Sequence, residues 1–230
     1  GTGVDVEIPT SVSAVWAQYF DHFDAEAVMA SYYGNWCVDS RSKYNALIQR
    51  LQARGVSDEA IQRRIKQAWV DAGEVGSAQG TKMHKQIELA LGGLEYDAAG
   101  VEMQQFHDLV ALEFVPRGYR LFRAEWSVYD STVMVAGQID ALFVDPAGAY
   151  HMVDWKRCKR RLDSTANACF RRYGKGPCEH LLDNDYVHYS LQQNLYAAIL
   201  RRRYDIVVSS MSLAQLHPDQ ASYHLSLIHI

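Results

Sequence analysis

The chain has 230 residues, of which 48% are hydrophobic and 22% charged, and its formal net charge at pH 7 is −4. These values are typical of a globular domain, and they exclude a strongly basic protein whose overall field attracts nucleic acid, so any such attraction has to be local. No apolar run is long enough to span a bilayer and no signal-peptide pattern opens the chain, so we expect no membrane partner. Because the sequence starts at Gly1 rather than methionine, we expect a piece of a longer protein, with other domains as partners.

Residues 10–95 are predicted to form a helical region. Behind a Thr/Ser cap at positions 10 and 11, apolar side chains recur at the spacing of an amphipathic helix. Further stripes of this kind predict helices over 24–33, 42–54, 57–69 and 81–91. Gly73, Gly76 and Gly80 loosen the pattern before the last of these segments, which is therefore predicted as a helix of its own.

One residue of the 81–91 helix has the chemistry of a metal ligand. His84 and Glu88 are four residues apart and share a face, at the edge of the apolar stripe. A lone histidine in that position is more often a packing or surface residue. A neutral imidazole nevertheless binds divalent metals well if oxygen ligands complete the shell.

From position 118 to the end, the chain is predicted to form a β-sheet core. Residues 119–129, 134–144 and 150–155 are rich in β-formers and separated by turn-forming sequences, which predicts three consecutive antiparallel strands. A helix over 186–203 and two strands over 204–216 and 221–230 follow.

Two aspartates and a lysine fall on neighbouring strands of this predicted meander. Asp154 and Lys156 share a face because side chains two apart on a strand point the same way, whereas Trp155 packs on the other face. Asp140 lies in an apolar run, where a carboxylate is costly without a cation or a hydrogen bond. These groups predict a magnesium site, although Asp-x-Lys is also common on solvated sheet faces. Glu125, on the first strand, either adds a carboxylate or simply faces solvent.

A basic stretch follows Lys156, within a predicted insertion over 157–185. Its cationic residues are Arg157, Lys159, Arg160, Arg161, Arg171, Arg172 and Lys175. Phe170 and Tyr173 are interleaved with them. A basic run is usually a solvated face, but beside the candidate site it is better explained as a loop that holds phosphates. The insertion is also long for a connection, as binding loops often are.

The cysteines give no clear metal signature. Cys37, Cys158, Cys169 and Cys178 include no C-x-x-C pair, so a zinc site has little support, and their spacing is loose for an iron–sulfur cluster. Free thiols in a reducing compartment are the favoured interpretation. This predicts an intracellular location, in cytoplasm, nucleus, organelle matrix or virus factory.

Four motifs stand in order along the chain. They are G-T-x-x-H ending at His84, G-x-I-D ending at Asp140, V-D-W-K ending at Lys156, and Q-x-x-x-Y from Gln192 to Tyr196. In this order, over nearly the whole chain, they resemble the RecB-like branch of the PD-(D/E)XK nuclease superfamily. The resemblance implies an α/β fold with a restriction-endonuclease-like core, in which a mixed β-sheet is flanked by helices and an N-terminal helical region precedes it. It also implies a single nuclease domain over residues 1–230.

The resemblance further implies a role for each motif residue. A divalent ion, Mg²⁺ or Mn²⁺, would be bound by Asp140, Asp154, the main-chain carbonyl of Trp155, and His84. Lys156 would orient or help deprotonate the attacking water and stabilise the charge of the transition state. Gln192 and Tyr196 would position the scissile strand or support Lys156. Glu125 matches an acidic position that some members of the superfamily use.

The implied activity is metal-dependent hydrolysis of phosphodiester bonds in DNA, by an exonuclease acting on ends or single strands in replication, recombination or repair. The alternative is a catalytically inactive nuclease fold that binds nucleic acid, but the joint presence of Asp140, Asp154 and Lys156 favours the enzyme. A restriction-type endonuclease would need a sequence-reading element, and none is recognisable. Two features depart from the branch: Asp140 follows isoleucine rather than proline, and all four cysteines precede Gln192 instead of following it. We therefore expect no iron–sulfur cluster.

Overall fold

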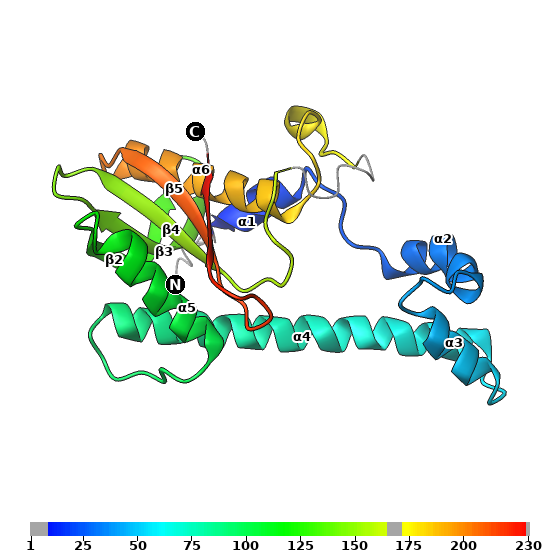
Figure 1. The fold of residues 1–230 in the computed structure, drawn as a ribbon. Coiled ribbons are helices and arrows are strands. Elements are labelled where there is room, and N and C mark those ends of the chain that lie inside the picture. The colour runs from blue at the N-terminus through cyan, green and yellow to red at the C-terminus, as the bar shows by residue number, and fades with distance from the viewer. Residues whose placement is uncertain (1–8, 165–171, 229–230) are drawn as a thin grey trace, which may run out of the picture. The chain divides into compact units, whose positions relative to one another are not determined.

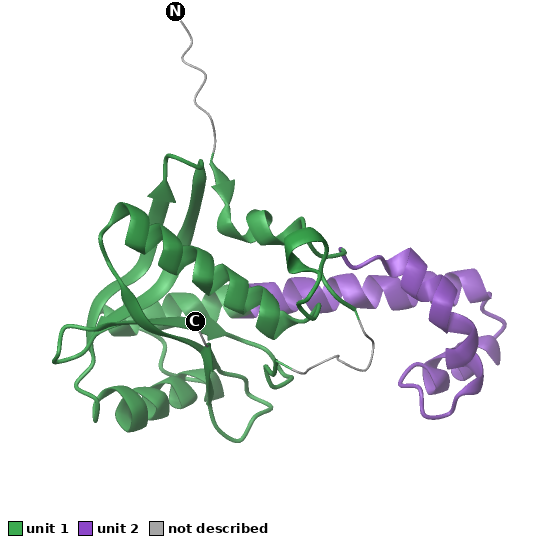
Figure 2. Ribbon diagram, turned by 90° about the horizontal axis from the view of Figure 1, so that it is seen from above, with its two compact units in different colours: residues 1–21, 80–230 green, residues 22–79 purple. Residues whose placement is uncertain are grey.

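The computed structural model describes residues 9–164 and 172–228. The chain divides into two compact units, which Figure 2 shows in different colours. Residues 1–21 and 80–230 form the first, here called the sheet unit, and residues 22–79 form the second, here called the helical unit. The predicted site residues that the structure describes all belong to the sheet unit.

Some predictions fall on residues that are not described, namely Cys169, Phe170 and Arg171. The other three cysteines, at positions 37, 158 and 178, are free thiols, as predicted. Within the described part of the chain, no helix has both the length and the apolar character that crossing a membrane requires.

The helical unit has a core of its own. Its elements are α2 (Ala25–Val38), α3 (Asn45–Gln52) and the first part of α4 (Asp58–Leu91). α2 begins after Asp24, whose side chain accepts hydrogen bonds from two main-chain N–H groups of the first turn. Met29, Ile48 and Ile61 are almost fully buried at the centre of the unit. The stripes that predicted helices over 24–33 and 42–54 are therefore packing stripes.

Helix α4 corrects one prediction. It runs without interruption from Asp58 to Leu91, so the segments 57–69 and 81–91 belong to one helix instead of two. Three glycines at positions 73, 76 and 80 lie inside it, and a Cβ atom added at any of them would meet nothing within 4 Å. A glycine costs only about 1 kcal/mol relative to alanine in a helix interior. The good helix formers on either side outweigh that cost.

The sheet unit contains a mixed sheet of six strands. They are β1 (Thr10–Ser11), β2 (Arg120–Asp130), β3 (Val135–Val144), β4 (Tyr150–Lys156), β5 (Val208–Gln215) and β6 (His224–Ile228). β2, β3 and β4 pair antiparallel, which confirms the predicted meander. β4 and β5 are parallel and are connected through α6 (Asp185–Arg203). β6 pairs antiparallel with β5, and the short β1 pairs parallel with the start of β3.

Helices cover both faces of this sheet, so the unit is a layered α/β structure (Figure 1). On one face, α6 and α1 (Val12–Ala17) pack through Leu200 and Val12 against strand residues such as Ile139. On the other face lie α5 (Val101–Leu109), the π-helical turn η1 (Val110–Phe114) and the last part of α4. Neither α5 nor η1 is among the predicted elements.

The hairpin between β3 and β4 sets the position of the site. Asp145 closes its turn, because its Oδ1 accepts hydrogen bonds from the N–H groups of Ala147 and Ala149, both at 2.9 Å. The ladder then runs back to the pair formed by Ala141 and Val153, the last one between these strands. Asp140 and Asp154 are the next residues along each strand, so they stand side by side where β3 and β4 part.

Candidate functional site

Three ligand-type side chains meet beside the end of the β3–β4 ladder. They are His84 from α4, Glu125 from β2 and Asp140 from β3, here called the His–Glu–Asp cluster, and one ligand atom of each lies within 4.8 Å of the others. The Nδ1 atom of His84 is 3.5 Å from Oδ2 of Asp140 and 3.7 Å from Oε1 of Glu125. The structure therefore brings together three of the predicted site residues from three separate elements.

Strand pairing explains why Glu125 faces this cluster. Its neighbours in β2 pair with Ala141 and Ile139 of β3, which places Glu125 opposite Asp140. The backbone of Glu125 has a φ of 46°, a left-handed conformation that side chains with a Cβ rarely adopt. Such strain costs about 1–3 kcal/mol and tends to occur at functional sites. This conformation favours the functional interpretation of Glu125 over that of a solvated strand residue.

The ring of His84 is held by the main chain of β4. Its Nε2 atom lies 2.8 Å from the carbonyl oxygen of Trp155. Because a carbonyl only accepts hydrogen bonds, Nε2 carries the proton, and in a neutral ring the lone pair of Nδ1 is on the side of the carboxylates. A histidine that binds metal usually donates its other N–H to a carbonyl or carboxylate in this way. In this structure the carbonyl of Trp155, predicted as a ligand, orients His84.

The charges of the cluster favour uptake of a cation. Burial and the nearby Asp154 raise the pKa of Asp140 to about 7. Burial lowers the pKa of His84, but the hydrogen bond to Glu125 and the charge of Asp140 outweigh that effect and raise it. The cluster thus holds a proton near neutral pH. A divalent cation would compete for the same place, since metal ligands must give up their protons.

Asp154 has different surroundings from Asp140. Its side chain is only 2% exposed, its Oδ2 lies 2.6 Å from Nζ of Lys156, and its Oδ1 accepts a hydrogen bond from Nε2 of Gln193 at 3.0 Å. Burial lowers the pKa of Lys156, but the charges of Asp154 and Asp140 outweigh burial and raise it, so the amine stays protonated. The same amine lies 4.3 Å from the centre of the Tyr189 ring. Asp154 and Lys156 therefore form a buried pair next to the His–Glu–Asp cluster.

The glutamine and tyrosine of the last motif contact each other on α6. Nε2 of Gln192 donates to the hydroxyl of Tyr196 at 3.0 Å. Tyr196 packs directly on Gly137 of β3, where an added Cβ would lie 2.5 Å from a ring carbon of the tyrosine. Gly137 thus allows α6 to approach the strand that carries Asp140.

Gln193, which is not among the predicted site residues, is the α6 glutamine that reaches Asp154. The spacing of Gln193 from apolar residues of the same helix could have identified it. Gln193 precedes Tyr196 by three residues and Leu200 by seven, so it falls on the buried stripe of α6. A polar side chain on such a stripe needs a polar partner.

Most of the described cationic residues of the basic stretch are paired with acidic side chains. Arg157 donates from Nε to Oε1 of Glu102 at 2.7 Å, and both side chains are mostly buried. Three further pairs are more exposed: Lys159 with Asp219, Arg172 with Asp183, and Lys175 with Asp21. Arg160 and Arg161 are exposed. Exposed ion pairs contribute only about 0–1 kcal/mol, so a phosphate would compete with them, whereas Arg157 is held in place.

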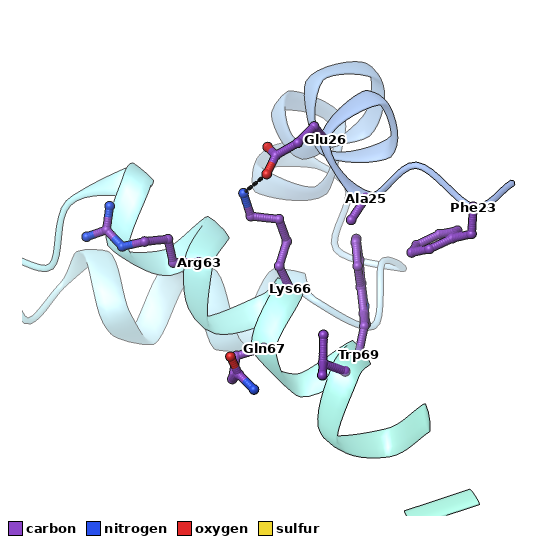
Figure 3. A pocket seen from close by; sticks show the side chains of 8 residues that line it. Phe23, Ala25, Glu26, Arg63, Lys66, Gln67 and Trp69 are labelled. Atoms are coloured by element: carbon purple, nitrogen blue, oxygen red, sulfur yellow. Dashed lines mark hydrogen bonds and ion pairs between the residues drawn. The ribbon is translucent and has the colours of Figure 1, made fainter. Parts of the chain in front are cut away.

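A separate pocket of about 560 Å³ lies in the helical unit, between the start of α2 and the first half of α4 (Figure 3). Phe23 and Trp69 line it, and Lys66 is paired with Glu26 at 2.5 Å on its wall. None of the predicted site residues belongs to this pocket.

No protein-family model matches the chain, and no curated protein matches it. Among solved structures, the crystal structure of SSO0001 is similar at a TM-score of 0.34 and 10% sequence identity, over 99% of this chain and 70% of that chain. A likeness at this level carries no argument about function, so the functional conclusion depends on the geometry of the site.

Proposed function

We propose that the protein is a metal-dependent deoxyribonuclease with a restriction-endonuclease-like core, acting as an exonuclease on DNA ends or single strands. The observation that carries the proposal is the His–Glu–Asp cluster standing next to the buried pair of Asp154 and Lys156. The order of elements, with three antiparallel strands, a crossover helix and a parallel strand, supports the same conclusion.

The donor set fits a hard divalent cation. Mg²⁺ in octahedral coordination has ligand distances of about 2.0–2.1 Å, so its ligand atoms lie about 3.0 Å apart when adjacent and about 4.2 Å when opposite. The distances of 3.5 and 3.7 Å from His84 to the two carboxylates fall between these values. Mn²⁺ accepts the same nitrogen and oxygen ligands. A bound ion would lower the pKa of a water molecule and neutralise charge on a phosphate.

The protein's own side chains supply the rest of the chemistry. Lys156 carries a positive charge that Asp154 and the ring of Tyr189 hold in place, and this charge would stabilise the negative charge that develops on the phosphate. Asp140 and His84 would give up the shared proton when the ion binds. Gln192 and Tyr196, on the neighbouring helix, would position the scissile strand.

The experiment uses DNA labelled at one end, single- or double-stranded, with Mg²⁺, Mn²⁺ or EDTA. We expect the protein to cleave it only with metal, and Asp154→Asn and Lys156→Met each to lower the rate at least about 100-fold while DNA binding persists. Lys82→Met is the matched control, since Lys82 forms an exposed pair with Asp97 in the same unit.

The double variant Asp154→Asn/Lys156→Met guards against misfolding, because replacing both members of a buried pair is often nearly neutral for stability. Wild-type protein that binds DNA but cleaves nothing with either metal would identify the alternative, an inactive nucleic-acid-binding fold. Products shortened one nucleotide at a time would support an exonuclease, and internal cuts would contradict it.

A further inference from the structure

Two of the three buried glutamines among the described residues hold loops together. Gln105 in α5 donates from Nε2 to the carbonyls of His217 and Gln220 and accepts at Oε1 from the N–H of His217. Gln215 in β5 likewise donates to two main-chain carbonyls and accepts from the N–H of Leu162. Both ends of each amide are used, and every partner is main chain. These two side chains serve the fold.

Gln193 is the exception. It is 1% exposed, yet it makes a hydrogen bond only to a side chain, that of Asp154, and its Oε1 has no partner in the described part of the chain. A buried acceptor without a partner costs about 1–3 kcal/mol. Gln193 holds no main chain in return for this cost, and its amide instead satisfies one oxygen of the buried Asp154 carboxylate.

We infer that Gln193 is a positioning residue of the site, which orients the carboxylate of Asp154 so that its second oxygen faces Lys156. The inference rests on the proposed function. With Oδ1 held at 3.0 Å by Gln193, Oδ2 lies 2.6 Å from Nζ of Lys156. Tyr189, one turn before Gln193 on α6, contacts the same amine. Helix α6 therefore contacts both members of the pair, Asp154 through Gln193 and Lys156 through Tyr189. If the carboxylate of Asp154 rotated, the positive charge of Lys156 would move with it.

The test compares Gln193→Met with Gln105→Met, because both remove a buried amide and keep a side chain of similar length. For Gln193→Met we expect a lower melting temperature, because Oδ1 of the buried Asp154 loses its donor. We also expect kcat per folded molecule to fall about 10–100-fold with an unchanged KM for DNA. For Gln105→Met we expect a lower melting temperature and an unchanged kcat. Gln193→Asn keeps the amide but withdraws it from Asp154 by one methylene, and should show the same loss of kcat.

An unchanged kcat in Gln193→Met and Gln193→Asn would overturn the positioning role while leaving the nuclease proposal intact. The role would also be wrong if kcat fell only in proportion to the folded fraction, as in a purely structural variant. Calorimetry with Mn²⁺ separates the two proposals: wild-type protein that neither binds Mn²⁺ nor cleaves DNA would refute the proposed function and this inference with it.

Discussion

Asp140 and Asp154 are aspartates on neighbouring strands, but their side chains have different surroundings. Asp154 is 2% exposed and has a cation on one oxygen and an amide on the other. Asp140 is 12% exposed, accepts a hydrogen bond at Oδ2 from the N–H of Trp155 at 2.8 Å, and faces a histidine and a second carboxylate. One carboxylate is paired with a cation of the protein itself, whereas the other holds a proton near neutral pH, which an ion from solution would replace under the proposed function.

Under the proposed function, one site would combine the permanent positive charge of Lys156 with the exchangeable charge of a proton or metal ion at Asp140. A buried carboxylate is costly unless it is paired. The charge of Asp154 is paired with Lys156 within the fold, whereas the charge of Asp140 depends on pH and, under the proposed function, on metal. In metal-free protein, substitution in the pair of Asp154 and Lys156 should therefore lower the stability of the fold, whereas substitution of Asp140 should raise it.

The largest effect is expected when the permanent pair is broken. Lys156→Met leaves the carboxylate of Asp154 buried without its cation, and removing one partner of a buried pair costs about 3–5 kcal/mol. Urea denaturation measures this loss. The exposed pair of Lys82 and Asp97 gives the reference, since Lys82→Met should cost at most about 1 kcal/mol. Equal losses in the two variants would mean that Asp154 and Lys156 are not a tight buried pair.

Asp140→Asn should have the opposite effect in metal-free protein. The pKa of Asp140 is raised to about 7, so the folded state binds this proton more tightly than the unfolded state does. The stability from this proton is fully present below about pH 4 and is lost as pH rises through 7. The variant has no such proton to lose. Between pH 5 and pH 8 in EDTA, the free energy of unfolding of the wild type should therefore fall by roughly 2–4 kcal/mol relative to that of the variant.

Denaturation at the two pH values measures this difference, with the exposed Asp97→Asn as control. Adding Mn²⁺ at pH 8 should make the wild type more stable than Asp140→Asn, because the ion stabilises only the protein that keeps its carboxylate. A stability difference independent of pH would show that Asp140 titrates normally and that the contrast with Asp154 is smaller than the geometry indicates.

The smallest effect concerns the exposed arginines next to the site. Arg160→Glu/Arg161→Glu should weaken DNA binding severalfold and lower the slope of its salt dependence by about one for each phosphate that is no longer bound. Fluorescence anisotropy over a range of salt concentrations measures both. Arg50→Glu, an exposed arginine of α3, is the control. Unchanged affinity would mean that these arginines form a solvated face.

The sheet and its crossover helix could be predicted because their patterns are local. The segments 119–129 and 134–144 lie close to β2 and β3, and α6, predicted over 186–203, starts one residue earlier at Asp185. The separate helix over 81–91 was wrong, since glycine weakens a helix without ending it. The segments predicted as strands over 204–216 and 221–230 began too early, since β5 starts at Val208 and β6 at His224.

The partners of the site residues depend on contacts that the sequence does not reveal. The motif residues predict the cluster. Which of Gln192 and Gln193 contacts Asp154 depends on how α6 is rotated about its axis. That rotation follows from the packing of Tyr196 on Gly137. The pairing of Arg157 with Glu102 depends on α5, an element outside the predictions.

The contact between Gly137 and Tyr196 has a consequence for the evolution of this protein. A methyl group at position 137 would overlap the tyrosine ring and also crowd Val12, so neither neighbour offers room for it. A larger residue at position 137 would therefore require a smaller side chain at position 196 and a small shift of Val12. In a library of substitutions, larger residues at position 137 should be recovered mainly together with smaller residues at position 196.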